Sequence, residues 1–203
     1  MIRRLATLSP IALALVPGRA AAHGFKADAE SYQAFLEGTG VIFEYPPAIL
    51  PLAALGVTLS LWSPEGLPSV VGFAIGGLLL GVFLAPAAGP WVVFAALAGG
   101  LAAALAGSLA LGRGLLPMAV LSVAACAAVT ALSFEGHGLG ELPLMIHLGI
   151  FLAALLALVA PAGLVRISFD QLGERAWLRI GWRIVCSWLA AILLLYAAFL
   201  AAG

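Results

Sequence analysis

The sequence predicts an all-α, polytopic membrane protein, a bundle of about six transmembrane helices that follows a cleaved signal peptide. Two observations lead to this class. Hydrophobic residues make up 64% of the 203-residue chain and charged residues only 9%, which is not the balance of a water-soluble globule. Long apolar stretches also alternate with short breaks rich in proline, glycine and charge, as in helices joined by turns. The net charge is zero, so nothing indicates a nucleic-acid partner.

The first 22 residues have the pattern of a secretory signal peptide. Arg3 and Arg4 precede a short apolar stretch, and small residues from Ala20 to Ala22 follow it. The apolar stretch has about a dozen residues, whereas a helix that spans a bilayer needs about twenty. An uncleaved N-terminal anchor is the alternative. Cleavage would place His23 at the N-terminus, where its α-amino group and imidazole can chelate one metal ion, unless it merely happens to follow the cut.

Six stretches beyond residue 45 approach or reach the length of a membrane-spanning helix. The chain is therefore expected to divide into the signal peptide (1–22), an outer-side N-terminal segment (23–45) and a six-helix transmembrane domain (46–203). The first stretch is short and contains three prolines, so we expect it to begin with an irregular or re-entrant turn. The predicted spans are 46–62, 67–85, 90–112, 114–132, 142–165 and 180–202.

The arginines give these spans an orientation. After a cleaved signal peptide, six crossings place both ends of the mature chain outside and the turns at 63–66, 112–114 and 166–179 inside. The positive-inside rule agrees, because all arginines beyond the signal peptide fall at those inner turns: Arg113, Arg166, Arg175, Arg179 and Arg183. We expect a location in the bacterial inner (cytoplasmic) membrane.

The outer face is predicted to be acidic and to carry all three histidines. Imidazole together with carboxylate suits divalent first-row metal ions. His147 is the sharpest candidate, because an ionisable group within a span is costly and tends to face the bundle interior or a pathway. The alternatives are an interfacial histidine bonded to a neighbouring helix, a solvated loop histidine, and glutamates that only favour helix N-termini. The candidate metal ligands are His23, Glu44, Glu135, His137, Glu141 and His147.

Small residues recur at three- and four-residue spacing, most clearly at 72–81 and 96–112. This spacing predicts helices that pack closely through backbone contacts, with helix sliding in a transport cycle as the alternative. Cys126 and Cys186 have no CxxC spacing and are expected to be small buried residues. The stretch 166–183 combines arginines at four-residue spacing with tryptophans, which indicates an interfacial helix leading into the last span.

These features resemble the HupE/UreJ family of hydrogenase and urease accessory membrane proteins. The resemblance rests on a signal peptide that ends before His23, six small-residue spans, a glycine- and histidine-containing junction ending Glu141-Leu142-Pro143, and a basic final connection. It implies a nickel or cobalt permease or a metal-binding accessory protein. The chain departs from the family's His-Pro-x-x-Gly-x-Asp-His motif, because the matching stretch is YPPAILPL (45–52), and it keeps only part of the second motif as FEGHGLGE (134–141).

Two functions follow as expectations. The first is a permease or metal-binding accessory protein for Ni²⁺ or Co²⁺, with Cu²⁺ as a further candidate, no tightly bound cofactor and an outer His/Glu site. The second is a non-transporting structural subunit of a larger membrane complex. An enzyme is not expected, because the sequence has no HExxH, no GxSxG and no paired intramembrane acids. The expected partners are the lipid bilayer, a divalent metal ion, and other membrane subunits or a second copy, without nucleic acid.

Overall fold

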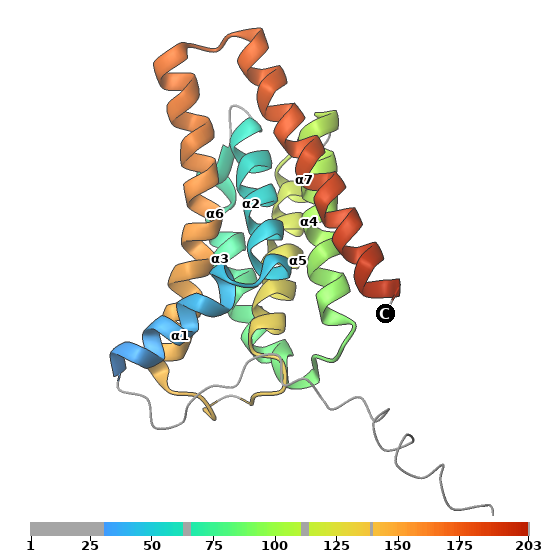
Figure 1. Ribbon diagram of the computed structural model, residues 1–203. Coiled ribbons are helices and arrows are strands. Elements are labelled where there is room, and N and C mark those ends of the chain that lie inside the picture. Colours follow the sequence, from blue (N-terminus) through green and yellow to red (C-terminus); the bar gives the residue numbers. More distant parts are fainter. Residues whose placement is uncertain (1–30, 63–65, 111–113, 139, 203) are drawn as a thin grey trace, which may run out of the picture.

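The structure is a computed structural model that describes residues 31–62, 66–110, 114–138 and 140–202 (Figure 1). The described residues contain helices and no strand, which confirms the predicted all-α class. The predicted signal peptide and His23 lie outside the described residues. The elements are α1 (Ser31–Phe43), α2 (Pro46–Leu61), α3 (Gly66–Leu84), the 3₁₀-helix η2 (Ala85–Ala87), α4 (Val92–Leu109), α5 (Leu115–Ser133), α6 (Leu144–Leu172) and α7 (Ala176–Ala202).

Five of the helices, α3 to α7, are long and apolar enough to cross a membrane. A sixth crossing arises if α1 and α2 are taken together as one bent pair. The predicted spans match α2 to α7, with one clear difference in the final connection. An interfacial helix was expected over 166–183, but α6 continues to Leu172 and α7 begins at Ala176. Residues 164–172 contain neither glycine nor proline, so α6 continues until Gly173, whose positive φ of 76° ends it.

Helix α2 begins after a sharp break, as its prolines predicted. The axes of α1 and α2 differ by 70°, and α1 lies across the beginning of α6 instead of continuing along the bundle (Figure 1). Pro46 and Pro47 occupy the first turn of α2, where their missing N–H groups have no helical partner to lose. At 16 residues α2 is only about 24 Å long, shorter than a hydrocarbon core of about 30 Å.

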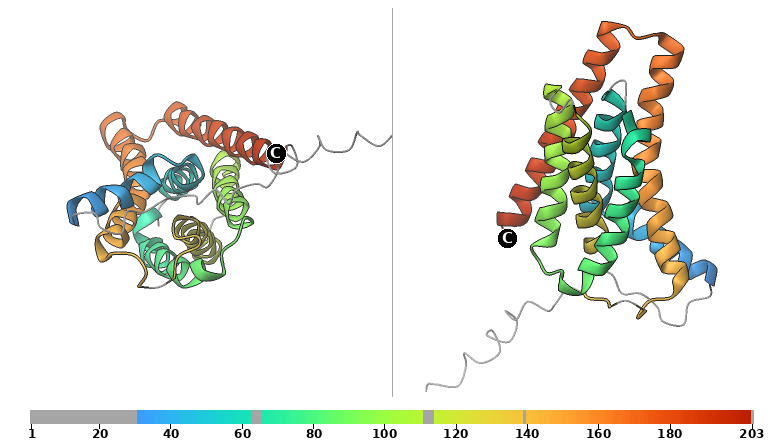
Figure 2. Two further views of the ribbon diagram at one scale, coloured as in Figure 1. Left: turned by 60° about the horizontal axis from the view of Figure 1, so that its bottom comes forward. Right: turned by 180° about the vertical axis from the view of Figure 1, so that it is seen from behind.

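The short helix α2 is nevertheless the centre of the bundle (Figure 2). It packs against α4 and α6 most extensively, and also against α5 and α7. Its buried residues lie on all sides of the helix, which is why its sequence shows no amphipathic stripe. Helix α7 is the opposite case, because most of its surface faces away from the bundle. Cys126 on α5 and Cys186 on α7 are both free and buried, as predicted.

Glycines make the central contacts close, as the small-residue spacing predicted. Gly56 of α2 faces the backbone carbonyl of Leu158 on α6 so closely that a Cβ atom would overlap it. Gly100 of α4 faces Pro51 of α2, and an added Cβ would lie 2.6 Å from the Pro51 Cα. Between membrane helices such contacts supply much of the stability, because lipid is as apolar as the helices and gives no hydrophobic driving force for association. Helices α1 and α6 meet in the same way at Gly38 and Gly149, and α3 and α5 at Gly77 and Gly81.

Hydrogen bonds from α2 add to these contacts. Thr58 donates its hydroxyl to the carbonyl of Ala103 on α4 at 2.7 Å, and the same oxygen lies 4.0 Å from the Cys186 sulfur on α7. Ser60 donates to the carbonyl of Ala162 on α6 at 3.0 Å. These two side chains thus connect α2 to three neighbouring helices. By contrast, the buried hydroxyl of Thr130 on α5 has no hydrogen-bond partner among the residues that the structure describes.

Substitution of Gly56 tests the importance of the α2–α6 contact. Gly56→Ala forces a Cβ against the Leu158 backbone, so we expect a loss of about 1–3 kcal/mol in the free energy of unfolding, measured by thermal or denaturant unfolding in detergent. Gly76→Ala on α3 is the matched control, because open space surrounds Gly76. There the helix propensity of alanine should stabilise the protein by up to about 1 kcal/mol. Equal effects at both positions would contradict the packing explanation.

Two threonines should respond to the same substitution with opposite sign. Thr58→Val removes the hydrogen bond to Ala103, and we expect a loss of about 0.5–1.5 kcal/mol. Thr130→Val exchanges a buried hydroxyl, unpaired within the described part of the chain, for a methyl group of similar size, and we expect a gain of about 1 kcal/mol. Thr58→Ser keeps the hydroxyl and serves as the control. Unfolding of the three variants under identical detergent conditions provides the comparison.

Candidate functional site

The ionisable side chains that the structure describes are divided between the two ends of the bundle. One end, here the acidic end, holds the α1–α2 connection, the α5–α6 connection and the start of α6 (Figure 1). Its ionisable residues include Glu37, Glu44, Glu135, His137, Glu141 and His147. The other end, here the basic end, holds the end of α6 and the start of α7. Its charged residues are Arg166, Asp170, Glu174, Arg175, Arg179 and Arg183.

The α5–α6 connection forms a structured turn at the acidic end. Gly136 and Gly140 both have positive φ angles, 81° and 85°, which side chains with a Cβ rarely adopt. Between these glycines, the backbone N–H of Gly138 donates to the Glu141 carboxylate at 2.7 Å. Pro143 then precedes the first helical residue of α6. The glycine-rich sequence therefore produces a defined loop that ends next to His147.

His147 lies in the first turn of α6, and its imidazole ring makes two contacts. Its Nδ1 is 3.2 Å from the backbone carbonyl of Pro143, and its ring stacks on Phe134 with centroids 4.8 Å apart and planes 30° apart. A carbonyl oxygen only accepts hydrogen bonds, so Nδ1 carries the hydrogen. In the neutral ring the lone pair is then on Nε2, which is the usual way in which a protein prepares a histidine to bind a metal.

The other predicted ligands of the α5–α6 connection also have local contacts. His137 places its Nδ1 3.2 Å from the carbonyl of Glu135. Glu135 in turn lies near Tyr45, in the connection between α1 and α2. Burial, followed by the proximity of Tyr196 and Glu135, raises the pKa of the Tyr45 hydroxyl above 10.0. The hydroxyl therefore stays neutral at physiological pH.

The structure places the five described candidates at one end without gathering them around one point. Glu44 is exposed in the α1–α2 connection, Glu141 is exposed in the loop, and His147 is half-buried against Phe134. Within residues 31–62, 66–110, 114–138 and 140–202, no group of three histidine, cysteine, aspartate or glutamate side chains could hold a metal ion. The sixth candidate, His23, lies outside these ranges. A complete coordination sphere is thus not formed by the described side chains alone.

Two residues of this end were missed by sequence reasoning. Phe134 supports the His147 ring, but the two residues are 13 positions apart on different elements, so no periodic spacing connects them. Tyr45 occupies the position just before α2 and lies near Glu135, far along the chain. An aromatic residue two positions after the predicted fourth span was the available signal for Phe134. No comparable signal existed for Tyr45, because its environment depends on tertiary packing.

Comparison of the chain with known protein families, with characterised proteins and with solved structures finds no match.

Replacement of Phe134 tests whether it holds the His147 ring. Phe134 is 2% exposed, and Phe134→Leu keeps an apolar side chain while it removes the stacked ring. We expect a loss of about 1–2 kcal/mol in unfolding free energy, the usual range for a buried large-to-smaller change that the core partly refills. Faster hydrogen–deuterium exchange in residues 134–147 should accompany it. Unchanged exchange there would show that the stack does not order the loop.

Proposed function

We propose that the chain is a membrane protein that captures a divalent transition-metal ion at its acidic end, as a permease or a metal-binding accessory protein. Nickel and cobalt are the first candidates and copper is the next. The role proposed is binding and transfer of the ion, without catalysis. The single observation that carries the proposal is His147, a histidine whose ring is oriented by Pro143 and Phe134 at the acidic end of the bundle.

The charge distribution supports cation capture. Four described glutamates lie at the acidic end, and the described arginines lie at the opposite end. A cation approaching the acidic end meets a field that raises its local concentration and its rate of association. If the basic end is cytoplasmic, as the positive-inside rule predicts, the ion is captured from the outer side of the inner membrane.

The donor chemistry favours a transition metal over calcium or magnesium. A neutral imidazole is a borderline ligand that suits nickel, cobalt, copper and zinc, whereas Ca²⁺ and Mg²⁺ prefer oxygen ligands alone. The hydrogen bond from Nδ1 to Pro143 fixes the tautomer that leaves Nε2 for the metal. Glu135 and Glu141 in the adjoining loop supply carboxylates that attract the hydrated ion.

His23 is proposed as the second nitrogen donor, from a mature N-terminus. Phe35, one turn into α1, touches Gly149 on α6, so the beginning of α1 lies beside the turn that carries His147. His23 precedes Ser31 by eight residues, a stretch with a maximum reach of about 26 Å. An N-terminal His23 can therefore reach His147 and offer both its α-amino group and its imidazole. Mass spectrometry of the purified protein, which reports whether the chain begins at His23, checks this step.

A structural subunit of a larger complex is the second candidate function. It is favoured by the close packing of the bundle centre, where glycine contacts bring α2 against α4 and α6. The described candidate ligands also do not converge on one point. In this role the exposed apolar faces of α3 and α7 would contact partner helices as well as lipid.

Metal binding by His147 variants distinguishes the two functions. We expect the mature protein to bind Ni²⁺ or Co²⁺ in isothermal titration and to carry the ion into liposomes. His147→Phe keeps an aromatic ring on Phe134 but removes Nε2, and it should weaken binding by at least about tenfold, or about 1.4 kcal/mol. Glu135→Gln should weaken it less, because it removes attraction and not a nitrogen donor.

The matched control is Glu174→Gln at the basic end. It removes the same charge as Glu135→Gln, but at the far end of the bundle, and should leave metal affinity unchanged. Equal losses in both glutamine variants would show that the effect is not local to the acidic end. The absence of metal binding and of metal-dependent flux in the wild-type protein would contradict the proposal and leave the structural subunit.

A further inference from the structure

Helices α6 and α7 extend beyond the other helices at the basic end (Figures 1 and 2). They contain 29 and 27 residues, whereas α3, α4 and α5 contain 19, 18 and 19. At 1.5 Å per residue the two long helices span about 43 and 40 Å and the shorter ones about 27–29 Å. A bilayer is about 30 Å thick in its hydrocarbon core and about 40–45 Å with its headgroups. The shorter helices therefore match the core, and the two long helices match the whole bilayer.

The extending part, here the α6–α7 overhang, consists of residues 164–182. It exposes apolar side chains, among them Leu164, Ile167 and Trp177, the last with 56% of its surface exposed. Arginines lie between these apolar residues: Arg166, Arg175 and Arg179. A mixture of exposed aliphatic residues, tryptophan and arginine is typical of the headgroup layer, where one surface meets both apolar chains and charged groups.

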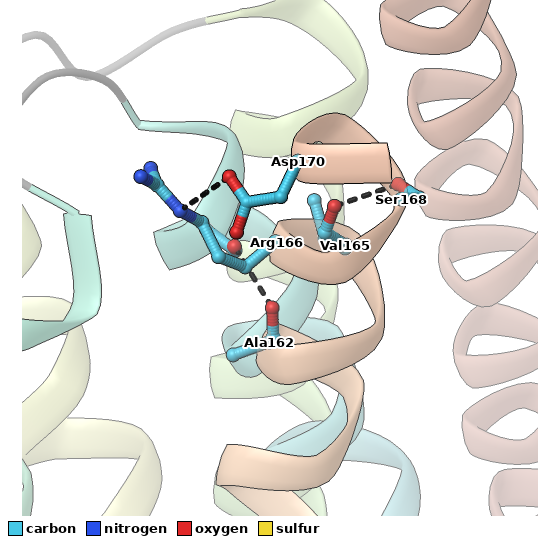
Figure 3. A network of polar contacts seen from close by, with 6 residues as sticks. Ala162, Val165, Arg166, Ser168 and Asp170 are labelled. Atoms are coloured by element: carbon cyan, nitrogen blue, oxygen red, sulfur yellow. Dashed lines mark hydrogen bonds and ion pairs between the residues drawn. The ribbon is translucent and has the colours of Figure 1, made fainter. Parts of the chain in front are cut away.

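Two hydrogen bonds connect α7 to its neighbours at the base of the overhang. The Trp182 indole N–H donates to the Ser168 hydroxyl at 2.8 Å and so connects α7 to α6. Arg183 donates from Nε to the carbonyl of Ser108 at the end of α4, also at 2.8 Å. Ser168 itself donates to the Val165 carbonyl within α6 (Figure 3). The arginines of the overhang are therefore presented from fixed helices at a defined depth.

Two of the three guanidinium groups of the overhang form exposed ion pairs. Arg166 pairs with Asp170 at 3.3 Å (Figure 3), and Arg179 pairs with Glu174 at 3.4 Å. Both pairs are more than half exposed, and exposed ion pairs contribute little because water screens them. The guanidinium of Arg175 makes no hydrogen bond or ion pair with the residues that the structure describes. Arginine matches phosphate oxygens with two parallel hydrogen bonds, so these side chains suit phosphate groups.

We propose that the α6–α7 overhang binds the headgroups of anionic phospholipids, with Arg175 and Arg179 contacting phosphate and Trp177 lying at headgroup depth. The excess of arginine over acidic residues on the overhang selects lipids with net negative charge over zwitterionic lipids. This surface is at the opposite end from His147, so lipid binding here is independent of the proposed metal capture.

Competition between two lipids tests the proposal on the full chain. The protein in detergent is mixed with equal amounts of phosphatidylglycerol and phosphatidylcholine, and native mass spectrometry counts the lipids retained. We expect preferential retention of phosphatidylglycerol, weakened by sodium chloride. Arg175→Gln should reduce the ratio by about fivefold, the factor that corresponds to about 1 kcal/mol per basic residue near an anionic surface. Arg175→Gln with Arg179→Gln should reduce it further.

Three controls make the result specific. Glu174→Gln removes a competing acid from the overhang and should raise the preference, whereas Glu37→Gln at the acidic end should leave it unchanged. Arg175→Lys keeps the charge and should keep most of the preference, and circular dichroism establishes that each variant is folded. Equal retention of both lipids, or a preference that survives the double substitution, overturns the proposal and leaves a protein partner for this surface. Displacement of the lipid by inorganic phosphate at equal concentration also overturns it.

Discussion

The fold depends on the close approach of α2 to its neighbours. This helix is too short to span the hydrocarbon core alone, and the chain bends at the prolines where it begins. Contact with lipid therefore contributes little to holding it in position. Its stability comes instead from backbone contact at Gly56 and Gly100 and from the hydrogen bond between Thr58 and Ala103. In a bilayer these terms replace the hydrophobic effect that would hold a water-soluble core together. The other helices are arranged around this contact.

The charged side chains that the structure describes lie at the two ends of the bundle. Ionisable side chains are costly in the hydrocarbon core, so the described ones are found at or near helix ends. The acidic end gathers the glutamates and the oriented His147, and the basic end gathers the arginines beside an overhang rich in tryptophan. This division of charge is the basis of both proposals, in which the acidic end attracts a cation and the basic end attracts phosphate groups.

The sequence predicted the fold better than it predicted the site. Apolar length and proline or glycine breaks are local properties, so the six predicted stretches correspond to α2 to α7, and the prolines indicated the irregular start of α2. The end of α6 was placed too early, at residue 165 instead of Leu172, and the start of α7 too late, at residue 180 instead of Ala176, because the charged residues between them were taken as the connection. For the site, the sequence predicted only that the candidate ligands lie at one end of the bundle. The stacking of His147 on Phe134 and the position of Tyr45 near Glu135 depend on how helices pack, which spacing along one helix does not contain.

The 70° bend between α1 and α2 has a consequence for the order in which the chain assembles. Gly38 of α1 meets Ile146 of α6 more than a hundred residues later in the chain. During synthesis α1 is therefore made well before α6, its main partner, and closing so long a loop carries an entropic cost that only the finished contact offsets. Helix α1 therefore packs into its final position only after α6 has been made. Because it closes beside His147, the acidic end takes its final form only when most of the bundle is already in place.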